Sequence, residues 1–213
     1  ARFELFSQRY PQDTRARDAL YNAGVYWDAV GERERSIESR RRFLTSFKGD
    51  DGAPAIAFEI CEQLEKGAHE FALRASSEAG WRRWGAVAQC YQEFAEAPYY
   101  GATESDLVCV AQSRRLHILR RELRDDAEAH RVESALKRLW GSGKRWRLEK
   151  PRCAKSRAGA IFQEAEELLV GLKALRLSPL DPTSAETVKR FKMSLGAKLD
   201  KRDEVAGAYR EVV

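Results

Sequence analysis

The segment Gly141-Ser142-Gly143-Lys144 contains the residue types of a phosphate-binding loop. Such a loop needs the spacing G-x-x-x-x-G-K-[ST] between a strand and a helix, so that backbone N–H groups surround the phosphate. Here a single residue separates the two glycines, Arg145 follows the lysine, and no strand pattern precedes them. The spacing therefore argues against nucleotide binding.

Residues that could hydrolyse a substrate or hold a metal ion are scattered along the chain. His69, His117 and His130 do not form H-E-x-x-H, and sequence order reveals no Ser–His–Asp or Cys–His arrangement. The cysteines form no C-x-x-C pair and have no histidine at metal-ligand spacing. We therefore expect a protein that is not an enzyme and that binds no metal ion or cofactor.

The four cysteines, Cys61, Cys90, Cys109 and Cys153, allow two interpretations. The first is that they are small hydrophobic side chains buried in a core. The second is a disulfide between Cys90 and Cys109, which lie at similar distances on either side of a turn predicted at Ala97–Thr103. Two antiparallel helices that meet at this turn would bring that pair face to face.

Segment 137–157 is the strongest local anomaly in charge. It has nine basic residues and one acidic residue, a local net charge of +8, while the whole chain carries +5. Trp140 and Trp146 lie between the basic residues. Four interpretations stay open: a solvated loop whose tryptophans pack on the helices, or a contact for an acidic protein, for anionic lipid headgroups or for nucleic acid. The basic residues are Lys137, Arg138, Lys144, Arg145, Arg147, Lys150, Arg152, Lys155 and Arg157.

Helices must position these residues, because apolar residues recur at helical spacing nearly everywhere and no stretch alternates with period two. The 43% hydrophobic content supports a real core, and the 33% charged content indicates amphipathic helices with solvated outer faces. The arginine groups Arg40–Arg42, Arg114–Arg115 and Arg120–Arg121 are predicted to lie on such exposed faces. No apolar run is long enough to span a membrane. The sequence therefore predicts an all-α fold.

The predicted helices come in antiparallel pairs joined by short turns, which is typical of an α-solenoid. Residues 141–155 have no apolar period and are predicted to form a long loop or a frayed helix start. We expect one repeat array over residues 1–213. Its parts are the end of a preceding repeat at 1–11, the clearest repeat unit at 16–48, and divergent helix pairs at 55–97, 103–140 and 156–213.

Segment Arg17–Lys48 resembles a tetratricopeptide repeat (TPR). On the first predicted helix, Leu20 occupies the family's large position, Ala23–Gly24 its small pair and Trp27 its aromatic position. On the second, Phe43 and Leu44 supply the apolar residues near the helix end. The resemblance implies a TPR-like right-handed solenoid of antiparallel helix pairs.

The same resemblance explains the small residues in this unit. Ser36 occupies the small position early in the second helix, and Gly24 has no side chain, so the two helices can approach closely there. Trp27 then fills the space beside them. Arg40 replaces the family's usual aromatic residue in the middle of the second helix. This departure indicates either a more open face or an arginine folded over a neighbour.

In TPR arrays the first helix of each pair lines a concave groove that binds a helix or an extended peptide. Tyr21 and Val25 stand where the clamp of chaperone-binding TPR domains has Lys and Asn, so that activity is not expected. By the resemblance, the groove residues are Asp18, Tyr21, Asn22, Val25 and Asp28.

Residues Phe3–Pro11 resemble the end of a preceding repeat, which closes with the family's terminal proline. With the A-L-Y-N-x-G sequence that follows, they resemble TPR units of bacterial cell-envelope proteins, which include outer-membrane assembly lipoproteins and periplasmic division coordinators. Residues 177–213 resemble TPR proteins of myxobacteria, some of which belong to the gliding-motility apparatus. The resemblance implies a location in the periplasm or cell envelope, with the cytoplasm as the alternative.

These observations predict a protein–protein interaction scaffold of a multiprotein envelope complex. Partners would bind in the groove, and partners with acidic segments would also contact the basic segment. The alternative is a helical repeat that binds nucleic acid through segment 137–157. Because the chain begins and ends inside predicted helices, we also expect it to be a piece of a longer protein.

Overall fold

The structure, a computed structural model, describes residues 2–72, 77–98, 105–139 and 150–212. Every regular element in these ranges is a helix, which confirms the all-α prediction. The chain divides into two compact units, Ala1–Gly143 and Lys144–Val213. A single right-handed TPR-like array over residues 1–213 stays a prediction.

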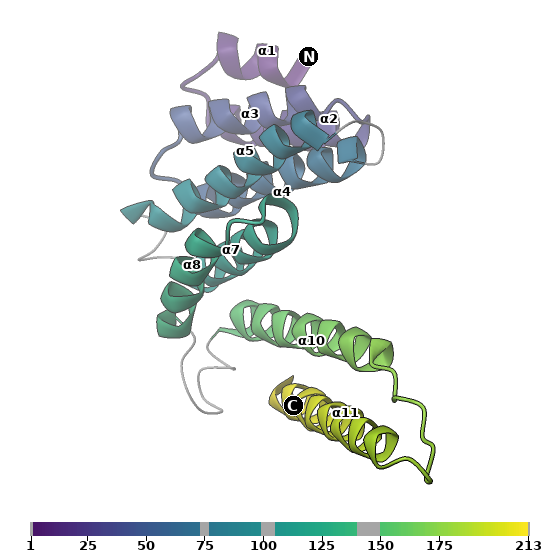
Figure 1. Cartoon of the computed structure of the whole chain (residues 1–213). Helices are drawn as coiled ribbons and strands as arrows, with labels where there is room; N and C mark the ends of the chain where they lie inside the picture. Colours follow the sequence, from purple (N-terminus) through teal and green to yellow (C-terminus); the bar gives the residue numbers. More distant parts are fainter. Residues whose placement is uncertain (1, 73–76, 99–104, 140–149, 213) are drawn as a thin grey trace. The chain divides into compact units, whose positions relative to one another are not determined.

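Unit 1 is a series of helices in which each helix packs against the next along the chain (Figure 1). Helix α4 also contacts α7, its second neighbour in the described part of this unit. The helices are α1 (Arg2–Arg9), α2 (Ala16–Ala29), α3 (Arg33–Ser46), α4 (Ala53–Ala72), α5 (Ser77–Glu96), α7 (Ser105–Ile118), the π-helical turn η1 (Leu119–Leu123) and α8 (Asp126–Leu139).

Local chemistry sets the ends of these helices. Gly31, between α2 and α3, has a φ of 82°, a left-handed conformation that glycine adopts without a steric penalty. At the end of η1, Arg124 adopts a φ of 55°, and the chain then starts α8 in a new direction. The side chain of Asp125 accepts a hydrogen bond from the backbone N–H of Glu128 at 3.0 Å, which caps the start of α8.

The apolar stripes predicted from the sequence form the core of unit 1. The larger cluster joins α4, α5 and α7 and includes Phe58, Trp84, Tyr91 and Ile118. A smaller cluster joins α2, α3 and α4 through Leu20, Phe43 and Ile56. Each interior helix therefore buries side chains against a helix on either side of it.

Unit 2 is one helical hairpin, α10 (Pro151–Ala174) packed against α11 (Ala185–Val212). Helix α10 begins at Pro151, where the missing N–H and the fixed φ of proline suit the first turn. Residues 151–155 of the segment predicted to be a long loop or a frayed helix start form the beginning of α10. Residues 140–149 lie outside the described part of the chain.

Candidate functional site

The five residues predicted to line a groove lie on the outer face of α2. Tyr21 is 38% exposed and Val25 is 42% exposed, one turn apart on the helix. Asp18 and Asn22 are exposed beside them, and Asp28 is partly exposed. The structure therefore brings all five together on the side of α2 that faces away from its buried residues, with an apolar pair surrounded by polar groups.

The inner face of α2 shows the predicted close approach to α3. The Ser36 hydroxyl donates a 2.9 Å hydrogen bond to the backbone carbonyl of Gly24, which places the two backbones in near contact. Trp27 is buried beside them, as the resemblance implied. This arrangement holds α2 so that its opposite face is turned outward.

Arg40 is folded over its neighbours and is 4% exposed. Of the two interpretations of its position, a more open face is therefore wrong and an arginine folded over a neighbour is confirmed. Its Nη1 donates to the Ser36 hydroxyl, and its Nε donates to Oε2 of Glu59 at 2.8 Å. A Cβ atom on Gly24 would lie 3.1 Å from Arg40 Nη1 and 3.2 Å from its Cγ. The glycine thus leaves room for the arginine side chain as well as for the helix.

Carboxylates along α4 pair with arginines from the helices on both sides of it. On α3, Arg40 pairs with Glu59, and Arg33 donates to both oxygens of Glu70 at 2.8 Å. On α7, one arginine bridges two further carboxylates of α4. We call the four glutamates of these pairs the α4 carboxylate row: Glu59, Glu62, Glu65 and Glu70.

The arginine on α7 is Arg114, and it belongs to a half-buried polar cluster with a tyrosine. Its guanidinium lies 2.9 Å from Glu62 and 3.0 Å from Glu65. The buried Tyr91 hydroxyl donates to Glu65 at 2.6 Å and accepts from Arg114 at 3.0 Å. Burial raises the pKa of Tyr91 far above its ordinary value, and the nearby Glu65 carboxylate raises it further. The tyrosine therefore stays neutral, and the cluster joins α4, α5 and α7.

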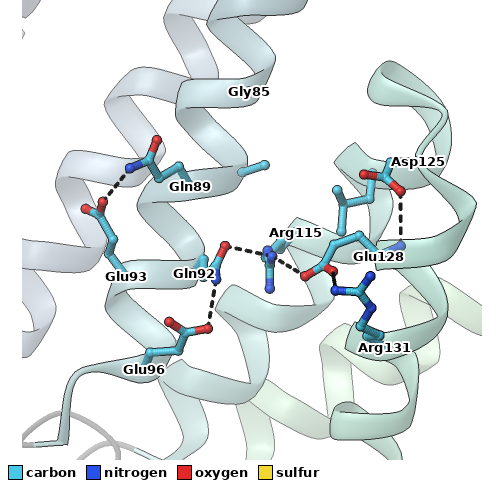
Figure 2. A pocket seen from close by; sticks show the side chains of 11 residues that line it. Gly85, Gln89, Gln92, Glu93, Glu96, Arg115, Asp125, Glu128 and Arg131 are labelled. Atoms are coloured by element: carbon cyan, nitrogen blue, oxygen red, sulfur yellow. Dashed lines mark hydrogen bonds and ion pairs between the residues drawn. The ribbon is translucent and has the colours of Figure 1, made fainter.

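A second region, a hollow of about 710 Å³, lies where α5, α7, η1 and α8 meet (Figure 2). Arg115 lies in the middle of its lining and is 6% exposed. It donates to Gln92 on α5 at 2.8 Å and to Glu128 on α8 at 2.6 Å. Glu128 also pairs with Arg131 at 2.8 Å. We call this region the α5–α8 hollow.

The prediction that the paired arginines lie on exposed faces is wrong for Arg40 and Arg115, which are both buried. Arg41, Arg42, Arg120 and Arg121 are exposed, as expected, and Arg114 is partly buried. The α5–α8 hollow was not predicted from the sequence. The sequence does contain one indication of the Arg115–Glu128 pair. Glu128 lies near the start of one helix, and its side chain could face an arginine of the helix before it.

The predicted disulfide between Cys90 and Cys109 is wrong, because Cys90 is bonded to Cys61 with a Cα–Cα separation of 5.6 Å. Cys61 lies on α4 and Cys90 on α5, so the bond joins the two helices of one hairpin. Cys90 therefore pairs with the helix before it, α4, and not with the helix after it, α7.

Only part of the basic segment is described. Lys137 and Arg138 end α8, and Arg152, Lys155 and Arg157 lie in the first two turns of α10. Lys144, Arg145 and Arg147 lie outside the described residues, as do Trp140, Trp146 and the glycine pair before Lys144. The four interpretations of this segment remain predictions.

Within the described ranges, no group of three or more His, Cys, Asp or Glu side chains could hold a metal ion. His69 packs edge-on against Trp84 at a ring distance of 4.7 Å, and His130 lies 3.8 Å from Glu133. None of the described helices combines the length and the apolar character that a membrane span requires.

Comparison with known proteins gives no assignment: no protein-family model matches the chain, and no curated protein and no solved structure shows significant similarity to it. The TPR resemblance of residues 17–48 therefore rests on the residues themselves. The site has to be interpreted from its own geometry.

Proposed function

We propose that this chain is a protein-binding scaffold and that the outer face of α2 is a contact for its partners. The carrying observation is the exposed pair Tyr21 and Val25, one turn apart and surrounded by Asp18, Asn22 and Asp28. Aromatic side chains in such patches supply most of the affinity in many interfaces, and the polar border supplies orientation. Binding of this kind needs no cofactor.

The stacked helices of unit 1 support this proposal physically. The hydrogen bond between Ser36 and Gly24, and Arg40 above them, fix the roll of α2 about its axis. A rigid helix presents its contact side chains without a large entropic cost on binding. We therefore interpret the α2 face as part of the concave groove of a TPR-like solenoid.

An extracytoplasmic location, in a bacterial periplasm or cell envelope, is part of the proposal. The Cys61–Cys90 disulfide supports it, because disulfides persist in oxidising compartments and are rare in the cytosol of mesophiles. An envelope complex, including the gliding apparatus, is the proposed setting.

Co-purification tests the α2 face. The tagged protein is cross-linked in the cells that produce it, and captured proteins are identified by mass spectrometry for wild type and for Tyr21→Ser/Val25→Ser. The matched control is Trp81→Ser/Val170→Ser, which removes two side chains that are 56% and 66% exposed and lie on other helices. We expect defined partners to be lost only from the α2 variant, and equal capture by both variants would contradict the proposal.

Nucleic-acid binding is a second candidate function, favoured by the cluster of Arg152, Lys155 and Arg157 on the first turns of α10. Fluorescence anisotropy with single-stranded and double-stranded oligonucleotides at near-physiological salt tests it. The comparison variant is Arg145→Glu/Arg147→Glu/Arg152→Glu/Arg157→Glu. Binding that this variant abolishes would favour nucleic acid, whereas an acidic protein lost from the same variant would favour the scaffold.

A further inference from the structure

The connection between α10 and α11 exposes large apolar side chains. Residues 175–184 join the two helices at one end of the hairpin of unit 2 (Figure 1). Leu175, Leu177 and Leu180 lie in this connection and are 36%, 42% and 52% exposed. Met193, in the first half of α11, is 67% exposed. We call residues 173–193 the hairpin tip, and it presents four large apolar side chains to its surroundings.

Internal hydrogen bonds fix the backbone of this connection. The N–H of Ser178 donates to the Ser194 hydroxyl at 3.0 Å, and Lys198 Nζ donates to the carbonyl of Leu175 at 2.9 Å. Two prolines in the connection have no N–H to satisfy. Backbone groups that are already paired cost less to transfer into apolar surroundings than unpaired groups do. The exposed leucines can therefore enter a nonpolar medium without leaving these groups unpaired.

The hairpin tip is also positively charged. It has five basic and two acidic residues, a net charge of +3 in a chain that carries +5 overall. Arg190 lies 3.5 Å from Glu186 and forms an ion pair with it. The other four basic residues are exposed and pair with no carboxylate in the described part of the chain: Lys173, Arg176, Lys189 and Lys192. The segment that carries the exposed apolar side chains thus also carries four cationic groups without a counter-charge.

This combination of side chains matches the surface of an anionic lipid bilayer. Peripheral proteins bind such a surface by burying apolar side chains at the boundary of headgroups and acyl chains, while Lys and Arg are attracted to the anionic headgroups. The positive charge of the tip is complementary to these headgroups. A protein partner would need a groove for each exposed leucine, whereas a bilayer accepts them without one. The observations therefore favour a lipid surface over a protein as the occupant.

We propose that the hairpin tip attaches this protein peripherally to an anionic bilayer. Leu177 and Leu180 enter the boundary between headgroups and acyl chains, and Lys189 and Lys192 lie against the headgroup phosphates. The contact is one of side chains with the bilayer surface, and no helix crosses the membrane in it. This inference goes beyond the proposed scaffold function, because it uses unit 2 and no residue of the α2 face.

Co-sedimentation of the whole chain with lipid vesicles tests the proposal. The probe is a vesicle of equal amounts of phosphatidylcholine and phosphatidylglycerol, and the comparison vesicle contains phosphatidylcholine alone. We expect binding to the anionic vesicle only, with an affinity that falls as salt rises. Leu177→Ser/Leu180→Ser removes two apolar side chains and Lys189→Gln/Lys192→Gln removes two charges, so each should bind about tenfold more weakly.

Two matched controls remove similar side chains from exposed positions of unit 1. Leu5→Ser/Val30→Ser and Lys48→Gln/Lys66→Gln should bind the anionic vesicle as wild type does. A variant with a gain in affinity separates the lipid contact from loss of fold. Leu180→Trp should bind a few times more tightly than wild type, because tryptophan is favoured at the membrane–water interface. A damaged fold would not give this increase.

Three outcomes would overturn the proposal: no binding of wild type to the anionic vesicle at low salt, equal binding to both vesicles, or wild-type affinity in either hairpin-tip double variant. In the last case, loss of binding from Arg145→Glu/Arg147→Glu/Arg152→Glu/Arg157→Glu would assign the lipid contact to the basic segment instead. None of these measurements depends on Tyr21 or Val25. Failure here is therefore distinguishable from failure of the proposed function.

Discussion

Units 1 and 2 use the same element, a pair of packed helices, and differ in how many sides of each helix are covered. In unit 1, α4 packs against α3, α5 and α7, and Phe43, Tyr91 and Leu136 are at most 1% exposed. In unit 2, α10 and α11 cover one side of each other. Among the described residues of unit 2, the buried side chains are Cys153, Ala165 and Val205.

The difference teaches where the stability of stacked hairpins comes from. A single hairpin buries one stripe of each helix and leaves Phe162, Val170 and Met193 between 47% and 67% exposed. A helix with neighbours on two sides buries two stripes, and its polar groups find partners on both. The following predictions test this contrast.

Truncation of an aromatic side chain should give the largest effect and the clearest contrast. Phe43→Ala in unit 1 should lower the free energy of unfolding by about 4 kcal/mol, because it leaves a cavity among α2, α3 and α4. Phe162→Ala in unit 2 should cost less than about 1 kcal/mol, since this ring is 47% exposed. Chemical denaturation of both variants measures the difference, and equal losses would remove the contrast.

Loss of a buried arginine should come next. Arg40→Ala should cost about 3 kcal/mol, because it uncovers Gly24 and leaves the Glu59 carboxylate without its arginine. Arg42→Ala, which breaks an exposed pair with Glu38 in the same helix, should cost less than about 0.5 kcal/mol. Urea titrations with unchanged m-values would establish that both numbers refer to the same transition.

Reduction of the disulfide should destabilise unit 1 by a similar or smaller amount. The Cys61–Cys90 bond closes a chain segment with a sequence separation of 29, and such a crosslink stabilises by about 2 to 4 kcal/mol. Cys61→Ser/Cys90→Ser should therefore unfold at a lower denaturant concentration. The amide protons of α4 and α5 should also exchange with solvent faster than in the wild type. A variant with unchanged protection of these helices would show that packing alone holds the hairpin.

The smallest effect concerns Tyr91, whose pKa is raised in the folded state by burial and by Glu65. A raised pKa means that the folded protein binds the proton more tightly, so this stabilisation is complete below about pH 10 and is lost as pH rises further. Tyr91→Phe should cost about 1 kcal/mol at pH 7 and should flatten the fall in stability above pH 10. The free energy of unfolding of wild type and of Tyr91→Phe, measured between pH 8 and 11, tests this prediction. The same dependence on pH in both proteins would contradict it.

The helices could be predicted from the sequence because their apolar stripes are periodic. The predicted helix pair at 55–97 contains α4 and α5, and the small residues Gly24 and Ser36 predicted the contact of α2 with α3. The prediction of a helix pair at 103–140 did not include the π-helical turn that follows Ile118 in the structure. Nothing in the spacing of apolar residues distinguishes a π-turn from an α-turn.

The buried arginines could not be predicted in the same way. A run such as Arg40–Arg42 follows the pattern of an exposed face, and its burial depends on whether a carboxylate of the next helix faces one member of the run. That pairing is set by the roll and offset of two helices, which a single sequence does not specify. The same limit applies to Cys90, because α4 and α7 each carry a cysteine and helix contacts select Cys61 on α4.

The α4 carboxylate row has a kinetic consequence. Glu59 and Glu70 hold arginines of α3, and Glu62 and Glu65 hold Arg114 of α7, so α4 cannot separate from one neighbour without strain on contacts with the other. Stacked repeats often fray from their ends one hairpin at a time. Here α3, α4, α5 and α7 should open as one cooperative block, and α1 should detach first on its own.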